Sequence, residues 1–145
     1  MLITDYIMIH YTKGNILDSD AVALVNTVNL VGVMGKGIAL QFKEQFPNNY
    51  KLYKQACKDK EIGIGKLFVT KEQTIFGEKY VINFPTKVDW RKPAEYSFIS
   101  SGLDDLVRIV DEYQISSIAL PPLGAGNGGL NWEKVKRMIE DKLGN

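Results

Sequence analysis

The sequence of 145 residues predicts an α/β fold, a three-layer α/β/α sandwich. Short apolar segments typical of strands alternate along the chain with longer segments that repeat apolar residues at helical spacing. Two of the predicted strands run directly into loops that hold several glycines, and each loop is followed by a predicted helix. No linker, internal repeat or low-complexity run divides the chain, so we expect residues 1–145 to form a single domain.

Composition is that of an ordinary globular protein. Hydrophobic residues make up 45% of the chain and the formal net charge is +1, so a nucleic-acid partner would have to rest on a local basic patch. No apolar run approaches the ~18 residues of a membrane span, and the N-terminus lacks the pattern of a signal peptide. The only cysteine, Cys57, cannot form an internal disulfide. We therefore expect a cytoplasmic protein with no membrane partner.

The first half of the chain is predicted to contain two strands and two helices. Residues 6–13 are β-rich and are predicted to form a strand, and the stretch that begins at Ala23 is predicted to be a buried strand that runs into the glycine loop 32–37. Apolar residues then recur every four positions, which predicts a helix from near Lys36 to Pro47. A second helix is expected over residues 48–59.

The second half continues the alternation of strands and helices. Residues 71–77 are expected to form a turn or a short β excursion, and Asn131 is a plausible N-cap. The connection 85–93 is rich in basic and aromatic groups, and strand-end loops carry function in α/β sheets. The predicted strands cover residues 66–70, 79–84 and 117–120, and the predicted helices cover residues 94–113 and 132–143.

Two glycine-rich loops indicate a ligand site. Residues 32–37 hold three glycines and residues 124–129 hold four, each directly after a predicted strand segment. Glycines let backbone N–H groups approach a ligand closely, and the following helix adds the positive end of its dipole. A tight strand-to-helix turn would explain one such loop, but two indicate a diphosphate held from both sides. Neither loop matches a P-loop or the dinucleotide fingerprint.

Three segments together resemble macrodomains, the modules that bind ADP-ribose: Val25-Asn26-Thr27-Val28-Asn29, residues 32–37 and residues 124–129. The resemblance covers residues 14 to about 143 and implies a mixed central sheet. It also implies one more edge strand after the last helix, where this sequence ends. We therefore expect the domain to be the N-terminal part of a longer protein, and a genuinely shorter natural domain is the alternative.

Further motifs resemble one branch of the macrodomains, which contains the DarG antitoxin macrodomains and the human terminal ADP-ribose protein glycohydrolase. These motifs are Gly35-Lys36-Gly37-Ile38-Ala39, Asn83-Phe84-Pro85-Thr86-Lys87 and Trp90-Arg91. The likeness to the DarG type is the closer. The second glycine loop has no acid where the human relative has an aspartate, which also favours the DarG type.

The resemblance implies how ADP-ribose would bind. Asn15 and Ile16 would face the adenine, and Asn29, which follows Asn26 at a strand end, would reach the distal ribose. The family usually has an aspartate in place of Asn15; the amide can still accept a hydrogen bond, without charge assistance, and could equally form an Asx-turn. The diphosphate would be held by two sets of loop residues: Gly32, Val33, Met34, Gly35, Lys36 and Gly37, and Pro122, Gly124, Ala125, Gly126, Asn127, Gly128 and Gly129.

The same resemblance implies a catalytic lysine, Lys87, which would attack the anomeric carbon of the distal ribose. A lysine nucleophile must be neutral, and burial beside Phe84 and Trp90 or proximity to Arg91 would lower its pKa. A solvated surface lysine is the alternative. The sequence does not identify the general acid or base.

The likeness to the DarG type implies a substrate and partners. The domain would hydrolytically remove ADP-ribose from thymidine bases of single-stranded DNA, and so act as the antitoxin of a cognate DarT toxin. The base would stack on Trp90, with Arg91 near the phosphates. A non-catalytic ADP-ribose reader, a hydrolase of ADP-ribosylated protein carboxylates or ADP-ribose phosphate, and a module that neutralises the toxin by contact remain as alternatives.

No cofactor and no metal site are expected. The sequence holds no cluster of histidines and cysteines with ligand spacing. The only histidine, His10, lies in a predicted strand, where a packed or edge position is the expected one.

Overall fold

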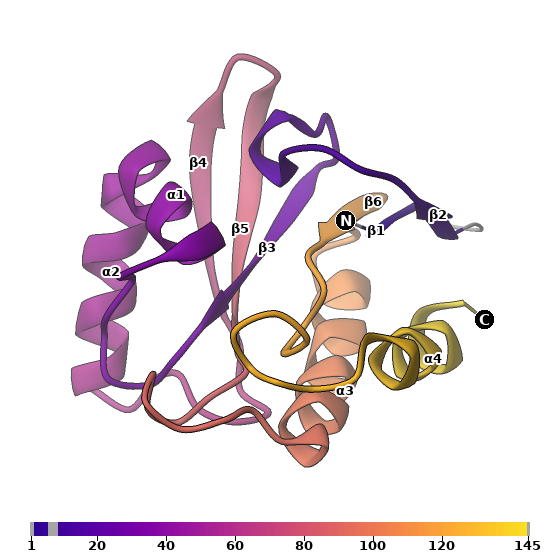
Figure 1. Cartoon of the computed structure of the whole chain (residues 1–145). Coiled ribbons are helices and arrows are strands. Elements are labelled where there is room, and N and C mark those ends of the chain that lie inside the picture. The colour runs from indigo at the N-terminus through magenta and orange to yellow at the C-terminus, as the bar shows by residue number, and fades with distance from the viewer. Residues whose placement is uncertain (1, 6–8, 145) are drawn as a thin grey trace.

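The computed structural model describes residues 2–5 and 9–144 (Figure 1). Within these residues one sheet has the strand order β2-β1-β6-β3-β5-β4. The strands are β1 (Leu2–Asp5), β2 (Ile9–Tyr11), β3 (Ala23–Val28), β4 (Phe68–Thr74), β5 (Gly77–Pro85) and β6 (Ser117–Leu120). The helices are α1 (Gly37–Gln45), α2 (Pro47–Lys58), α3 (Tyr96–Glu112) and α4 (Trp132–Leu143), and a short 3-10 turn covers Ile16–Asp18.

The sheet is mixed, and its central strands are parallel. Strand β3 pairs in parallel with β5 and with β6, whereas β1–β2, β1–β6 and β4–β5 are antiparallel pairs. The carboxyl ends of β3, β5 and β6 therefore meet at one end of the sheet, and the loops that follow them lie there together (Figure 1). In open α/β sheets this is the usual place of a ligand site.

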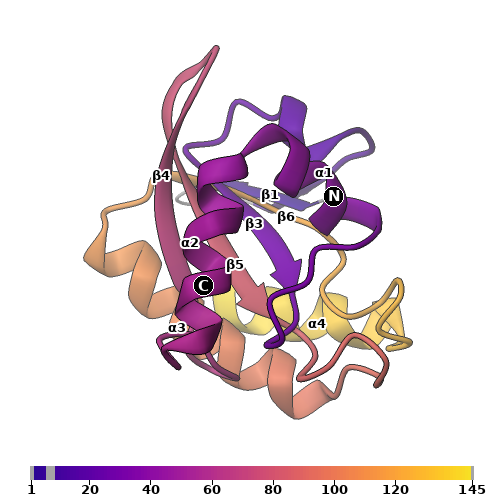
Figure 2. The same ribbon diagram turned by 90° about the vertical axis from the view of Figure 1, so that its left-hand side faces the viewer.

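Helices cover both faces of the sheet, with α1 and α2 on one side and α3 and α4 on the other (Figures 1 and 2). On β3, Ala23 and Val25 belong to the cluster under α3 and α4, whereas Leu24 packs with Phe42 of α1. Because both faces of β3 are buried, its sequence is a continuous apolar run rather than an alternating one. The predicted three-layer α/β/α sandwich is confirmed.

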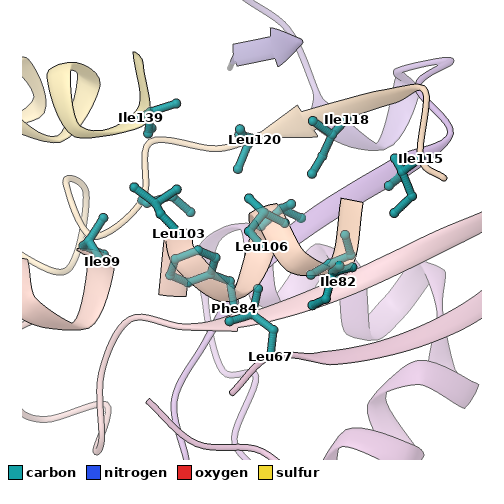
Figure 3. Close-up of a cluster of buried hydrophobic side chains, with 14 of the residues drawn as sticks. Leu67, Ile82, Phe84, Ile99, Leu103, Leu106, Ile115, Ile118, Leu120 and Ile139 are labelled. Atoms are coloured by element: carbon teal, nitrogen blue, oxygen red, sulfur yellow. The ribbon is translucent and has the colours of Figure 1, made fainter. Parts of the chain in front are cut away.

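The larger core cluster lies between the sheet and α3 (Figure 3). Its centre is the ring of Phe84, which is fully buried. Gly102 of α3 allows the helix to approach this ring, since a Cβ atom at that position would lie 2.3 Å from Cζ of Phe84. The close contact holds the end of β5, and with it the loop that follows, against α3.

The strands differ from the predicted ones in several places: β5 covers Gly77–Pro85 where residues 79–84 were predicted, and β4 begins at Phe68 rather than at residue 66. Strand β1, which lies between β2 and β6, was not predicted. Of the strand predicted over residues 6–13, only Ile9–Tyr11 forms a strand, β2. Residues 6–8 lie outside the described residues. Strand β4 continues to Thr74, through the polar residues where a turn was an option. Pairing decided both cases: β1 is held by its two antiparallel neighbours, and Thr74 pairs with Gly77 of β5.

The helix predictions are confirmed to within two or three residues. Helix α4 has the predicted bounds, and the side-chain oxygen of Asn131 accepts a hydrogen bond from the backbone N–H of Lys134 at 3.1 Å, as an N-cap does. His10 lies exposed on edge strand β2, and Cys57 is half-buried on α2. None of the helices in the described part of the chain is long and apolar enough to cross a membrane.

Candidate functional site

A cavity of about 540 Å³ lies at the carboxyl ends of β3, β5 and β6. Both glycine loops and the loop after β5 line it, together with the first turn of α1. Its lining residues are Thr27, Val28, Asn29, Val33, Gly35, Lys36, Ile38, Ala39, Thr86, Lys87, Trp90, Pro121, Pro122, Gly124, Gly126, Asn127 and Gly128.

Asn29 organises the first glycine loop from its base. The Asn29 side-chain oxygen accepts hydrogen bonds from the backbone N–H groups of Val31 (3.0 Å) and Val33 (3.4 Å), and its amide nitrogen donates to the Val33 carbonyl at 2.8 Å. The Tyr53 hydroxyl also donates to that side-chain oxygen, at 3.0 Å. Burial raises the pKa of Tyr53, so this hydroxyl stays protonated and acts as a donor. The amide of Asn29 therefore shapes the loop, and its predicted reach to the distal ribose stays a prediction.

Asn26 lies beneath the first glycine loop and contacts Met34, a residue of that loop. Both side chains are buried, and the Asn26 amide nitrogen contacts the Met34 sulfur at 3.8 Å. Neither residue lines the cavity. Among the described residues, the Asn26 side-chain oxygen has no hydrogen-bond partner. The side chain of Asn26 thus supports the loop through the buried side chain of Met34.

Close backbone packing holds the second glycine loop. Gly124 has a φ of +69°, and its carbonyl accepts a hydrogen bond from the N–H of Leu130 at 2.9 Å. A Cβ atom at Gly128 would lie 2.3 Å from the Gly124 carbonyl oxygen, so only glycine fits there. The Gly128 carbonyl in turn accepts from the N–H of Ala94 at 3.0 Å. The loop is therefore a compact turn tied to the segment that precedes α3.

The two glycine loops approach each other beside the cavity. A Cβ atom at Gly37, where φ is +63°, would lie 3.6 Å from the side-chain nitrogen of Asn127. Helix α1 begins at Gly37, and its N-cap Lys36 makes no side-chain capping bond. The first N–H groups of α1 are therefore available beside the cavity, where the helix dipole favours an anion.

Lys87 joins the loop after β5 to the second glycine loop. The half-buried side chain of Lys87 donates from Nζ to the Asn127 carbonyl at 2.9 Å. Just before it, the Thr86 N–H donates to the Val28 carbonyl at 3.0 Å, which extends the β3–β5 pairing into the loop. A primary amine is thus held at the cavity wall, between groups of two loops.

A buried amide pair fixes β5 just before this loop. The side chains of Asn83 on β5 and Asn49 on α2 exchange hydrogen bonds of 2.9 and 3.1 Å, and the Thr70 hydroxyl donates to the Asn49 side-chain oxygen at 2.7 Å. Both asparagines are fully buried. The pair ties α2, β4 and β5 together, four residues before Lys87.

The loop 86–93 carries an exposed ring and an ion pair. Trp90 lines the cavity and is 51% exposed, and the Arg91 guanidinium lies 5.5 Å from the centre of its ring. Arg91 does not line the cavity; it binds the Asp89 carboxylate through two nitrogens, at 2.7 and 3.0 Å. Hydrogen bonds from Arg91 hold the pKa of Asp89 well below its usual range and raise the pKa of Arg91. Arg91 therefore faces Asp89 rather than Lys87.

The Asp89–Arg91 pair predicts a pH dependence. Because the pKa of Asp89 is lower in the folded protein than in the unfolded chain, the pair stabilises the fold above about pH 4 and ceases to do so as the pH falls through the folded value. We expect Arg91→Ala to raise the pKa of Asp89 toward about 3.9. A carboxyl titration by NMR measures this shift, and an unchanged value would contradict the assigned cause.

A smaller cavity of about 290 Å³ adjoins the first one. The two share Ile38, Pro121 and Pro122, and Asn15 and Ile16 line the smaller cavity. The Asn15 side-chain oxygen accepts a hydrogen bond from the N–H of Leu17 at 3.0 Å and so caps the 3-10 turn. The Asx-type role is thus present, and the contact with adenine stays a prediction.

The structure brings most of the predicted site residues to one place, but not all of them. Six predicted site residues line neither the larger nor the smaller cavity: Asn26, Gly32, Met34, Gly37, Arg91 and Gly129. Ala125 lines a neighbouring cavity with Tyr11 and Trp132. The sequence analysis missed Thr27, Val28, Ile38, Ala39, Thr86 and Pro121. Five of the six stand inside the motifs that carry the resemblance, and Pro121 precedes the predicted residue Pro122, so their places in the sequence are the signal that could have found them. Among the described residues, no group of three His, Cys, Asp or Glu side chains could hold a metal ion.

Fold and site together define a class of protein: an α/β/α domain whose glycine loops enclose a cavity suited to a phosphate-bearing nucleotide. The model of the Macro domain family matches residues 25–139, and the chain belongs to that family.

Relatives within the family are similar over nearly the whole chain. A DNA ADP-ribosyl glycohydrolase of Mycobacterium tuberculosis is 53% identical over 132 residues, which cover 91% of this chain and 38% of that relative. The structure of the macrodomain of Mycobacterium tuberculosis DarG matches with a TM-score of 0.88 and 52% identity, over 91% of this chain and 87% of that one. The structure of Thermosipho africanus DarTG in complex with ADP-ribose matches with a TM-score of 0.85 and 36% identity, over 90% of this chain and 37% of that one. The predicted likeness to DarG macrodomains is confirmed, and the chain spans 38% of the length of the curated relative.

Proposed function

We propose that this domain binds ADP-ribose and hydrolytically removes it from thymidine bases of single-stranded DNA, as the antitoxin of a DarT-type toxin. The observation that carries the proposal is the placement of Lys87, whose amine lies at the wall of the cavity, 2.9 Å from the Asn127 carbonyl. The likeness to a DNA ADP-ribosyl glycohydrolase and to DarTG solved with ADP-ribose supports the same function.

In the proposed binding mode the diphosphate lies between the two glycine loops. The N–H groups at the start of α1 and those of the loop 124–129 donate to its oxygens, and the Lys36 side chain adds a positive charge at the cavity. The adenine lies in the adjoining cavity beside Asn15 and Ile16, and the distal ribose reaches toward Lys87. The two cavities adjoin at Ile38, Pro121 and Pro122, so the two halves of one ligand can occupy both.

The proposed chemistry begins at the anomeric carbon of the distal ribose. The neutral Lys87 amine attacks this carbon, the base leaves with the electron pair of the glycosidic bond, and the proton lost by the alkylated amine passes to the base. Water then attacks the same carbon, the bond from carbon to the lysine nitrogen breaks, and one proton of the water passes to that nitrogen, which restores the neutral lysine and releases ADP-ribose. The Asn127 carbonyl orients the amine through its hydrogen bond before the attack.

The proposed partners are ADP-ribosylated single-stranded DNA and a cognate DarT toxin. The cavity mouth carries the Trp90 ring, on which a base can stack, and the cation of Arg91 beside it. We also propose the cytoplasm as the compartment, because a single free cysteine suits a reducing environment.

The experiment that tests the function follows release of ADP-ribose from an oligonucleotide carrying ADP-ribose on a thymidine. We expect the wild-type domain to release ADP-ribose and to bind free ADP-ribose in calorimetry. Binding without release from this oligonucleotide would contradict the glycohydrolase and leave a reader of ADP-ribose. Release only from an ADP-ribosylated glutamyl peptide would assign the hydrolysis to a different substrate.

A further inference from the structure

An exposed apolar surface surrounds the Lys87 end of the cavity. It consists of four side chains that are 40 to 51% exposed, and we call it the apolar rim: Val31, Val33, Val88 and Trp90. Large apolar side chains exposed in one place on a domain typically mark a binding surface. Two of the four follow β3, and the other two follow β5.

The apolar rim is one continuous structure because its two loops are hydrogen-bonded to each other. The N–H of Leu30 donates to the carbonyl of Val88 at 3.0 Å, directly between the two halves of the rim. The parallel pairing of β3 and β5 places both loops at the same end of the sheet (Figures 1 and 2). The rim is therefore held by the sheet itself and has a defined position relative to Lys87.

Two of the four side chains of the apolar rim line the cavity. Val33 and Trp90 both line the cavity, together with Lys87, and they belong to different loops. Among the residues that the structure describes, no carboxylate lines the cavity, and the carboxylate nearest to Lys87 in sequence, Asp89, is bound by Arg91. A group attached to the ribose at Lys87 therefore meets an apolar surface on leaving the cavity.

We propose that the apolar rim holds the leaving nucleobase and selects an uncharged aromatic leaving group over a carboxylate or a phosphate. Val33 and Trp90 are then specificity-determining residues. The assignment rests on the proposed function and deepens it, because it names what distinguishes the substrate. A nucleobase presents a flat face that stacks on an indole ring and packs against a valine. A carboxylate or phosphate placed there would lose water, and the neighbouring Arg91 guanidinium is already paired with Asp89.

Binding to a catalytically inactive variant separates this proposal from the proposed reaction. With Lys87→Ala as the background, we expect the ADP-ribosylated oligonucleotide to bind about tenfold more tightly than free ADP-ribose, because the base adds stacking. Adding Val33→Ser or Trp90→Ala removes this gain, so that each double variant binds the oligonucleotide no more tightly than it binds free ADP-ribose, whatever its own Kd for free ADP-ribose. Val107→Ser is the matched control, since Val107 is equally exposed, at 40%, but lies on α3.

The binding results test whether the apolar rim holds the base, and the release results test the proposed hydrolysis. If the oligonucleotide binds no more tightly than ADP-ribose, or if the gain survives both rim substitutions, the apolar rim does not hold the base. If the gain depends on the rim but the wild type releases nothing from the oligonucleotide, the rim stands and the proposed hydrolysis fails. In the wild type, we expect the same two substitutions to lower release from DNA about tenfold relative to release from ADP-ribose phosphate.

Discussion

The Lys87→Ala variant is expected to bind ADP-ribose and to lose the release of ADP-ribose from modified DNA by about 10³-fold or more, as removal of a nucleophile does. The side chain is half-buried at the wall of the cavity, where its amine donates a hydrogen bond to the Asn127 carbonyl. Losing that bond costs the fold only about 1 kcal/mol. Single-turnover kinetics and calorimetry on the same preparation measure the two effects.

A second variant of Lys87 and a control at another lysine show which property of Lys87 matters. Lys87→Arg keeps a positive charge and a donor for Asn127 but cannot become a neutral nucleophile, so we expect it to be as inactive as the alanine variant. Lys71→Ala, which removes an exposed lysine from edge strand β4, should leave the rate unchanged. If Lys87→Arg kept most of the activity, Lys87 would act by its charge and not as the attacking group.

The Gly128→Ala variant is expected to have the second-largest effect, on both binding and stability. The added Cβ atom would lie 2.3 Å from the Gly124 carbonyl oxygen and 2.8 Å from Cα of the same residue, and backbone atoms cannot move aside without opening the loop. We expect the free energy of unfolding to fall by about 1–3 kcal/mol and ADP-ribose affinity to fall about tenfold. Urea unfolding and calorimetry measure these losses.

Gly126→Ala is the matched control for stability. It makes the same substitution in the same loop, but a Cβ atom there meets nothing within 4 Å. Its free energy of unfolding should stay within about 0.5 kcal/mol of the wild type. Equal stability of the two variants would show that the contact with Gly124 does not constrain the loop.

By itself, the sequence determined the elements whose pattern is local. The apolar runs of β3 and β6 and the helical periodicity of α1 to α4 predicted those elements, because burial on one or both faces leaves a regular spacing of apolar residues. Glycine-rich loops that follow two strands predicted a ligand site. The motifs Asn83-Phe84-Pro85-Thr86-Lys87 and Trp90-Arg91 indicated which branch of the macrodomains the chain resembles.

Only the tertiary structure decided the features that depend on partners distant in sequence. Strand β1 exists through its pairing with β2 and β6, and the polar end of β4 is a strand because β5 pairs with it. The structure also places Asn26 beneath the first loop, engages the amide of Asn29 within it, and brings Lys87 to Asn127, forty positions away. A local pattern records which side chains are buried, whereas a site is assembled from strand ends that meet only when the sheet has formed.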